Sequence, residues 1–299
     1  MQNRPECDLT LTDDETKILL KYFPQGVVAF DLEMTGLSPV FDKIIEIAAA
    51  KLLPNGEVTF YHQMINPLVS IPDYTIEFHQ ITNDMVRDCP TLKKPLLEFN
   101  EFYGSLPIIA HNAQFDVGYL VKGHHEFNYP FSLSDVFDSC IFSRALYKKE
   151  KSSESKPLSF KLGDLAKFFD IEFNHHQALD DAMVSLKVFA QCLVKFNFLE
   201  NDRSLKDISF LYKINSFKKA AEYELPKKLL PLREKLIKRE KVFIKYKGGT
   251  HGSDYRAVEP VSLLPMPQGL ILYAKCLETN MNKHFMVNKI KDLKLELDK

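Results

Sequence analysis

The sequence predicts an α/β domain followed by a smaller, mainly β domain. Between residues 27 and 195, short apolar segments of strand length alternate with segments of helical periodicity. From residue 241 the pattern changes to period-two alternation, with turn signals at Gly248-Gly249 and from Pro265 to Gly269. The charge divides at the same place, because residues 1–200 hold 18 Lys and Arg against 28 Asp and Glu, whereas residues 201–299 hold 21 against 12.

These changes place the domain boundaries. We expect the α/β domain over residues 1–198, a helical connector over 199–240 that is broken by Pro226 and Pro231, and the β domain over 241–299. By the counts above, residues 1–200 carry a net charge of −10 and residues 201–299 a net charge of +9. A basic module favours an anionic partner, although a lysine-rich soluble domain can have the same composition.

Composition excludes several classes of protein. No apolar run approaches the roughly 20 residues that a membrane-spanning helix needs, and the N-terminus lacks the pattern of a signal peptide. The five cysteines are odd in number, widely spaced and never in CxxC pairs, which argues against a disulfide framework and a thiolate zinc site. We expect a cytoplasmic protein with no membrane partner.

The elements of the first domain can be assigned in order. An amphipathic helix over 8–23, capped near Thr12 or Asp13, leads into a buried strand that contains Asp31 and Glu33. Asn55-Gly56 predicts a hairpin between two further strands, so the first three strands should form an antiparallel meander. The remaining expected elements are a helix over 91–103, a strand over 107–111, a helix from about 112, a surface loop over 148–157, a helix over 160–169 and a helix opened by residues 175–182. The β domain should hold strands over 241–247, 256–264, 269–277 and 283–288.

Asp31 and Glu33 lie two positions apart on the first strand. Since side chains alternate along a strand, both carboxylates project from the same face. At about 4 Å and an effective dielectric near 20, the pair would repel by about 4 kcal/mol. A protein relieves this repulsion by protonating one group or by binding a cation. The alternative is a strand that ends in solvated acids.

Three segments in order resemble the exonuclease motifs of the DnaQ-like (DEDDh) 3′–5′ exonucleases, and the resemblance covers roughly residues 25–197. The segments run from Asp31 to Leu37, from His111 to Asp116 and from His176 to Asp181. The resemblance implies a ribonuclease H-like fold, in which helices flank a mixed sheet. It also implies that the metal-binding carboxylates are Asp31, Glu33, Asp116 and Asp181, and that the general base is His176. Substrate contacts are implied for Met34, Thr35, Leu37, His79, Asn112 and Phe115.

The implied chemistry explains these residue types. Cleavage of a phosphodiester develops negative charge on the attacking and leaving oxygens, which two divalent cations can stabilise together. Mg²⁺ or Mn²⁺ prefers carboxylate oxygens, so we expect two such ions per active site. A histidine with a pKa near 6.5 can deprotonate the attacking water at neutral pH. We therefore expect a metal-dependent exonuclease acting on 3′ ends of single-stranded DNA or RNA.

Several alternatives stay open. His175 competes with His176, and Asp180 with Asp181. The first motif together with Ile44 to Ala48 also resembles oligoribonuclease, whereas the second motif is closer to polymerase proofreading exonucleases, so the sugar preference is undecided. A rival function is a regulatory protein whose nuclease-like domain only holds 3′ ends. All five functional positions are filled, which favours the enzyme.

Residues 241–293 resemble a WYL domain, a family of SH3-like barrels that bind nucleic acid or nucleotide ligands. The resemblance rests on three segments, which are 256–260, 269–276 and 283–290. The family's name-giving Trp-Tyr-Leu is replaced by Leu270-Ile271-Leu272, and two arginines by lysines. We expect the phosphate backbone to be held by Lys245, Lys247, Arg256, Lys283 and Lys289. The alternative is a barrel with a structural or a dimerising role; in the second case the protein would be a homodimer.

Overall fold

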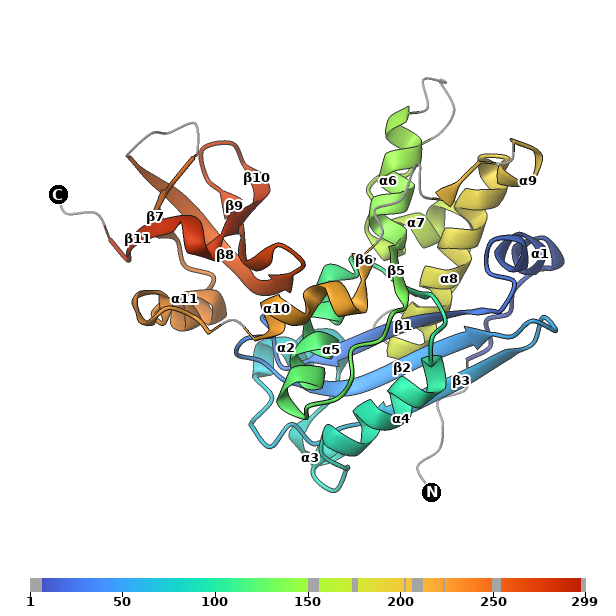
Figure 1. The fold of residues 1–299 in the computed structure, drawn as a ribbon, viewed down its shortest axis with the longest axis horizontal. Helices are drawn as coiled ribbons and strands as arrows, with labels where there is room; N and C mark the ends of the chain where they lie inside the picture. The colour runs from blue at the N-terminus through green and yellow to red at the C-terminus, as the bar shows by residue number, and fades with distance from the viewer. Residues whose placement is uncertain are drawn as a thin grey trace.

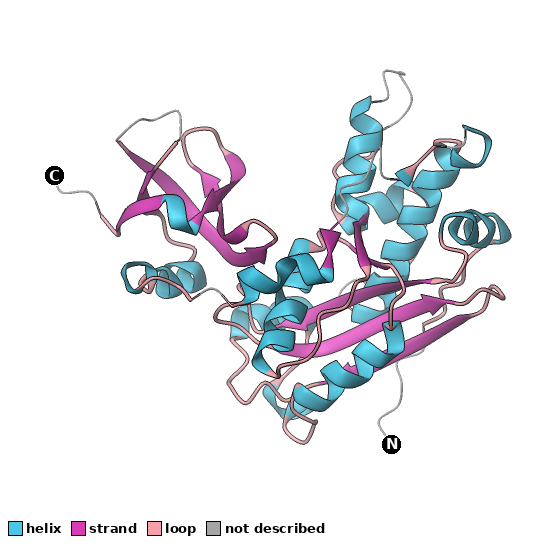
Figure 2. Ribbon diagram, viewed as in Figure 1, coloured by secondary structure: helices cyan, strands magenta, loops and turns pink. Residues whose placement is uncertain are grey.

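The structure is a computed structural model, and it describes residues 7–149, 156–173, 177–201, 203–205, 212–222, 224–248 and 254–296. These residues form two β-sheets with helices around the first (Figures 1 and 2). The first sheet has the strand order β3-β2-β1-β4-β5-β6. Its strands are β1 (Val27–Met34), β2 (Ile44–Leu52), β3 (Val58–Met64), β4 (Ile108–Ala110), β5 (Asp135–Asp138) and β6 (Tyr212–Lys213).

The first sheet is mixed, as expected. Strands β1, β2 and β3 form the antiparallel meander, and its hairpin turns at Asn55-Gly56, where Gly56 adopts a φ of +88° that favours glycine. Strands β4 and β5 join β1 in parallel. Thr12 caps the first helix through a capping box with Glu15, which confirms one of the two expected caps.

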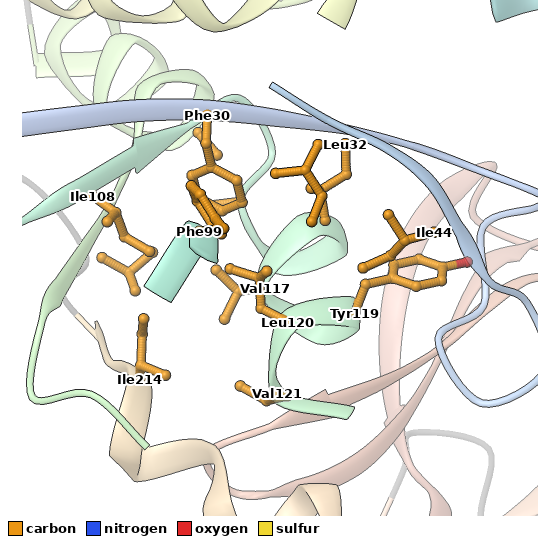
Figure 3. Packing of buried hydrophobic residues seen from close by; sticks show 14 of the residues in the cluster. Phe30, Leu32, Ile44, Phe99, Ile108, Val117, Tyr119, Leu120, Val121 and Ile214 are labelled. Atoms are coloured by element: carbon orange, nitrogen blue, oxygen red, sulfur yellow. The ribbon is translucent and has the colours of Figure 1, made fainter. Parts of the chain in front are cut away.

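Helices cover both faces of the first sheet. Their bounds are α1 (Asp13–Tyr22), α2 (Asp73–His79), α3 (Asn83–Val86), α4 (Lys93–Tyr103), α5 (Gln114–Glu126), α6 (Ser139–Lys149), α7 (Leu162–Phe168), α8 (Ala178–Lys195), α9 (Phe198–Asn201), α10 (Lys218–Ala221) and α11 (Leu232–Lys238). Side chains of one face of β1, such as Phe30, pack with Phe99 of α4 and Val117 of α5 (Figure 3). Val27 and Ala29 point the other way and pack with α1 and α8. Because Asp31 and Glu33 continue this second alternation, they face α8.

The connector differs from the expected helical segment. Within its described residues, β6 pairs antiparallel with β5, and a 3₁₀ turn η2 (Ile214–Phe217) inserts Ile214 and Phe217 into the core between the sheet and α5. Two short helices, α10 and α11, follow. The connector is therefore partly an edge of the first sheet, because pairing with β5 satisfies backbone groups that a short strand cannot satisfy alone.

The second sheet contains the four expected strands and a fifth. Its order is β10-β9-β8-β7-β11, all antiparallel. The strands are β7 (Val242–Tyr246), β8 (Tyr255–Met266), β9 (Gly269–Cys276), β10 (Met281–Met286) and β11 (Ile290–Lys294). The expectation of an SH3-like barrel is not borne out, because β10 and β11 do not pair among the described residues. Leu229 of a 3₁₀ turn, η3 (Lys227–Leu229), and Leu232 of α11 cover the apolar face instead.

The two sheets share one hydrophobic core. Leu264, Met266 and Ile271 of β8 and β9 pack in the cluster that holds the α5 face of the first sheet. Helix α5 approaches β8 closely, since a Cβ on Gly118 would lie 3.4 Å from Pro265 Cδ. The second sheet therefore packs directly against the first domain. Among the described residues, no helix combines the length and apolar character that crossing a bilayer requires.

Candidate active site

Four buried or half-buried carboxylates meet where β1 approaches α5 and α8. Asp31 and Glu33 come from β1, Asp116 from the first turn of α5 and Asp181 from the first turn of α8. One carboxylate oxygen from each of Asp31, Glu33 and Asp181 lies within 4.8 Å of the others. Asp116 lines the same pocket. The fold thus brings together all four carboxylates that the sequence singled out.

Hydrogen bonds hold the second motif beside β1. Asp116 Oδ1 accepts from Leu32 N at 3.1 Å, which ties the start of α5 to the strand. Asp138, at the end of β5, accepts from Ala113 N and from Ile141 N, both at 2.9 Å. Asp138 therefore positions the loop before α5. Sequence reasoning missed this residue, although an acid that closes a buried strand is a usable signal.

Burial and mutual repulsion raise the pKa of the clustered carboxyl groups. Burial raises the pKa of Asp31 well above its ordinary value, and the charges of Asp116 and Asp181 raise it further. Burial followed by the charge of Glu46 raises the pKa of Glu33 to about 9. The pKa of Asp116 is raised to about 7 by burial, against the opposing effect of backbone hydrogen bonds. A divalent cation among these oxygens would favour their ionised forms, so the donor set fits Mg²⁺ or Mn²⁺.

A fifth acid lies next to the cluster. Glu46 of β2 pairs directly with Glu33 of β1, so both side chains project from the same face. His62 of β3, which is opposite Ala48 in the register, reaches Glu46 diagonally, with Nε2 2.5 Å from Glu46 Oε1. Glu46 belongs to the segment from Ile44 to Ala48, which carried part of the sequence resemblance. The Glu46–His62 pair therefore lies beside Glu33, outside the residues that line the pocket.

The carboxylates line a pocket of about 480 Å³. Of the expected substrate contacts, five line it, which are Met34, Leu37, His79, Asn112 and Phe115. Thr35 does not. It is buried, and its hydroxyl accepts from Lys43 N at 3.0 Å. Thr35 therefore shapes the loop after β1, and we no longer count it as a direct contact.

Sequence reasoning missed several lining residues, among them Tyr74, Phe78 and Arg239. Tyr74 and Phe78 lie one turn apart on α2, and Phe78 is 54% exposed. Their spacing was readable, since aromatic residues four apart on a helix share a face. Arg239 also lines the pocket, and it arrives from the end of α11, far along the chain. No local pattern could have placed it there.

The comparisons with known proteins agree with this geometry. The sequence profile of the family described as Exonuclease matches residues 28–189, which is more than half of the chain. The chain belongs to this exonuclease family. Two similar relatives are DNA polymerases III of the PolC type. The protein from Clostridium perfringens is 34% identical over 208 residues (67% of this chain, 14% of the polymerase), and that from Halalkalibacterium halodurans is 38% identical over 157 residues (52% and 10%). The chain thus spans only about a tenth to a seventh of the length of these relatives.

The fold likeness extends beyond the matched family region. E. coli exonuclease I in complex with a 5cy-dT13 oligonucleotide has a TM-score of 0.54 and 14% identity, and the match covers 90% of this chain and 64% of that one. A second structure of exonuclease I gives a TM-score of 0.50 at 16% identity over the same share of this chain. The similarity in fold thus covers a larger share of this chain than the matched family region does.

The two acids at the start of α8 differ in their surroundings. Asp181 belongs to the carboxylate cluster, whereas Asp180 interacts with Cys7 on the other side of the helix start. The structure thus groups Asp181 with the other carboxylates of the exonuclease. His175 and His176 lie outside the described residues, so the expectation for the general base stays a prediction.

The five basic residues expected to hold a strand do not share one environment. Lys247 and Lys289 are exposed neighbours, since Lys247 N donates to Lys289 O at 3.0 Å. Lys245 and Lys283 are half-buried on separate strands. Arg256 is only 6% exposed, with its Nε 3.8 Å from Glu278 Oε2 and its guanidinium over the Phe285 ring. Arg256 is therefore an interior residue, and we leave it out of the proposed strand-binding surface.

The raised pKa values predict how metal and pH affect stability. Glu33 and Asp116 hold their protons in the folded protein up to about 9 and about 7, far above their ordinary values of 4.5 and 3.8. The stability contributed by the neutral forms is complete below the ordinary values and is lost as pH rises through the folded ones. In EDTA, we expect the melting temperature to fall between pH 6 and pH 9, and Mg²⁺ to raise it most at the higher pH.

Differential scanning calorimetry with EDTA or Mg²⁺ at both pH values measures this effect. Glu33→Gln is the matched control, since it removes a carboxyl whose pKa is raised to about 9 and should flatten the dependence on pH. A Mg²⁺-induced shift that is larger at pH 6 would contradict the assignment of these carboxyls as ligands.

Proposed function

We propose that the protein is a 3′–5′ exonuclease that hydrolyses the terminal phosphodiester of single-stranded nucleic acid with two Mg²⁺ or Mn²⁺ ions. The observation that carries this proposal is the convergence of four carboxylates from β1, α5 and α8 in one pocket. Membership of the exonuclease family supports the reaction class. The oligonucleotide in the solved complex of E. coli exonuclease I, a protein of similar fold, supports the class of substrate.

The chain's own residues divide the work. Asp31, Glu33, Asp116 and Asp181 would hold the cations, which supply charge stabilisation at the attacking and leaving oxygens. His176, one residue before the N-cap Gln177 of α8, would accept the proton of the attacking water. The expected contacts that line the pocket, Met34, Leu37, His79, Asn112 and Phe115, would hold the terminal nucleotide against the carboxylates.

Apolar and aromatic side chains are prominent in the part of the pocket that would hold the terminal nucleotide. Phe115 lies edge-on to Tyr273 of β9, with ring centroids 5.8 Å apart, so the second sheet fixes the position of a lining ring. Phe78 is the exposed member of the α2 pair and can stack on a base. Stacking of this kind tolerates any base, so we propose cleavage that is independent of sequence, with DNA and RNA both as candidate substrates.

One assay tests this proposal. The protein is incubated with 5′-labelled single-stranded DNA or RNA in Mg²⁺ or Mn²⁺, and the products are resolved on a gel. We expect a ladder that shortens one nucleotide at a time from the 3′ end and that disappears in EDTA. A circular single strand is the control and should stay intact. Cleavage of the circle, or binding of linear strands without any cleavage, would exclude an exonuclease; the second result would favour the rival function of holding 3′ ends.

We also propose that the second sheet assists capture of the strand. Lys247 and Lys289 form an exposed basic pair, with Lys245 and Lys283 as further candidates. Because part of this sheet completes the core of the first domain, deleting it would expose buried side chains. The same assay is therefore run on the intact protein with a dinucleotide and a long strand at two salt concentrations. Capture by these lysines should make only the long substrate salt-sensitive.

A further inference from the structure

The candidate active site adjoins a second cavity between the two sheets. This cavity has a volume of about 300 Å³ and is walled by the loop after β1, by α11 and by strands β8, β9 and β10. Figure 1 shows α11 beside β8. Three residues line both spaces, which are Leu37, Tyr74 and Arg239. The two spaces therefore meet at this trio, and a strand leaving the active site on this side would pass Arg239.

Arg239 has an unusual backbone conformation. It is the C-cap of α11, with φ +51° and ψ +36°, in the left-handed region that glycine prefers. Its backbone N–H closes the helix on Leu236 and Lys235. Its exposed guanidinium makes no hydrogen bond or ion pair with any residue that the structure describes. The left-handed backbone of Arg239 costs conformational energy, and its guanidinium donors are available at the mouth of the site. Both features indicate that Arg239 binds a ligand.

The other charged groups of the second cavity are mostly matched. Arg233 stands over the Phe41 ring, and its charge lies close enough to Asp42 to lower the pKa of that carboxyl, although burial raises the pKa overall. Lys275 and Glu259 are opposite each other in the register of β9 and β8, so their opposite charges lie on neighbouring positions of the sheet. Asn282 of β10 pairs with Lys275 on the other side. Arg239 therefore supplies the excess positive charge at the junction.

We infer that Arg239 binds the phosphate immediately upstream of the scissile one, and that the second cavity receives the nucleotide beyond it. This inference rests on the proposed exonuclease function and assigns the direction in which the strand leaves the site. A guanidinium presents a planar fork of donors that matches two phosphate oxygens, which a lysine cannot reproduce. The site would thus recognise the sugar–phosphate backbone of the substrate and would not discriminate among its bases.

Short substrates test this inference. A dinucleotide without a 5′-phosphate contains only the scissile phosphate, whereas a trinucleotide also contains the upstream one. Arg239→Gly removes the guanidinium and suits the left-handed backbone, so it should fold at least as stably as the wild type. We expect it to raise KM for the trinucleotide about 10-fold and to leave the dinucleotide unchanged. A 5′-phosphorylated dinucleotide should behave like the trinucleotide, and Arg239→Lys should recover only part of the loss.

Lys238→Ala is the matched control, because Lys238 is an exposed neighbour that pairs with Glu234 and lines neither space. Binding of a non-hydrolysable trinucleotide, followed by fluorescence anisotropy, gives a readout independent of turnover. Equal effects of Arg239→Gly on dinucleotide and trinucleotide, or none on either, would overturn the inference. Inhibition by a free mononucleotide that requires Arg239, with no dependence on substrate length, would mean a product site instead. If the wild type hydrolyses no substrate, the proposed function itself fails; the anisotropy measurement then still decides whether Arg239 binds the upstream phosphate.

Discussion

Asp31→Asn and Asp181→Asn are each expected to reduce hydrolysis by about 10³-fold or more. Both substitutions keep the shape of the side chain but remove a charged oxygen from the group whose ligand atoms lie within 4.8 Å of one another. With fewer negative ligands, the site would lose the ions on which charge stabilisation depends. Rates of mononucleotide release in Mg²⁺ measure the effect.

The same variants should remain folded. The pKa of Asp31 is raised by burial and then by the charges of Asp116 and Asp181, which means that its ionised form is destabilised in the metal-free fold. Removing that charge should leave the melting temperature in EDTA unchanged or higher, and the stabilisation by Mg²⁺ should shrink. Asp180→Asn is the matched control at the start of α8 and should retain activity, because Asp180 is turned toward Cys7. If Asp180→Asn were inactive and Asp181→Asn active, our choice between the adjacent acids would be wrong.

His176→Ala is expected to slow hydrolysis by about 10²–10⁴-fold, as is usual when a general base is lost. Metal binding should persist, since the four carboxylates stay in place, so the stabilisation by Mg²⁺ should match that of the wild type. Raising the pH should partly restore the rate, because hydroxide then replaces the missing base. The measurement is a pH–rate profile of kcat alongside thermal melting in Mg²⁺.

His175→Ala provides the control for this prediction. The two histidines are adjacent, and only the five-residue step from His176 to Asp181 distinguishes them in sequence. We expect His175→Ala to keep most of the activity at every pH. The reverse ranking would identify His175 as the base, and equal, small effects would show that neither histidine takes the proton.

Much of the fold could be predicted because its signals are local. Thr12 with Glu15 forms a capping box, and Asn55-Gly56 forms the hairpin turn, so a few neighbouring residues were sufficient to place these features. The alternation of β1 likewise predicts that Asp31 and Glu33 share a face. These features depend on backbone geometry over a single strand or turn, which the identities of adjacent residues determine.

Other features depend on contacts that are distant in sequence. Strand β6 has only two residues and exists because β5 offers a partner, and β11 was missed although it pairs with β7. Arg256 looked like a surface cation in the alternating pattern, but the shape of the second sheet encloses it beside Phe285. Short strands and burial are set by neighbours in space, which local periodicity does not reveal.

The sequence by itself singled out Asp31, Glu33 and Asp116, since each belongs to a motif with its own spacing, and it narrowed the fourth carboxylate to Asp180 or Asp181. The structure grouped Asp181 with the other three. Only the tertiary structure decided what surrounds them. It excluded Thr35 from the pocket wall, placed Glu46 opposite Glu33, and brought Arg239 from the end of α11 to the junction with the second cavity. The physical reason is that ligand identity follows from side-chain chemistry, whereas the walls of a pocket form where separate elements pack against one another, and here those elements belong to two sheets with a common core.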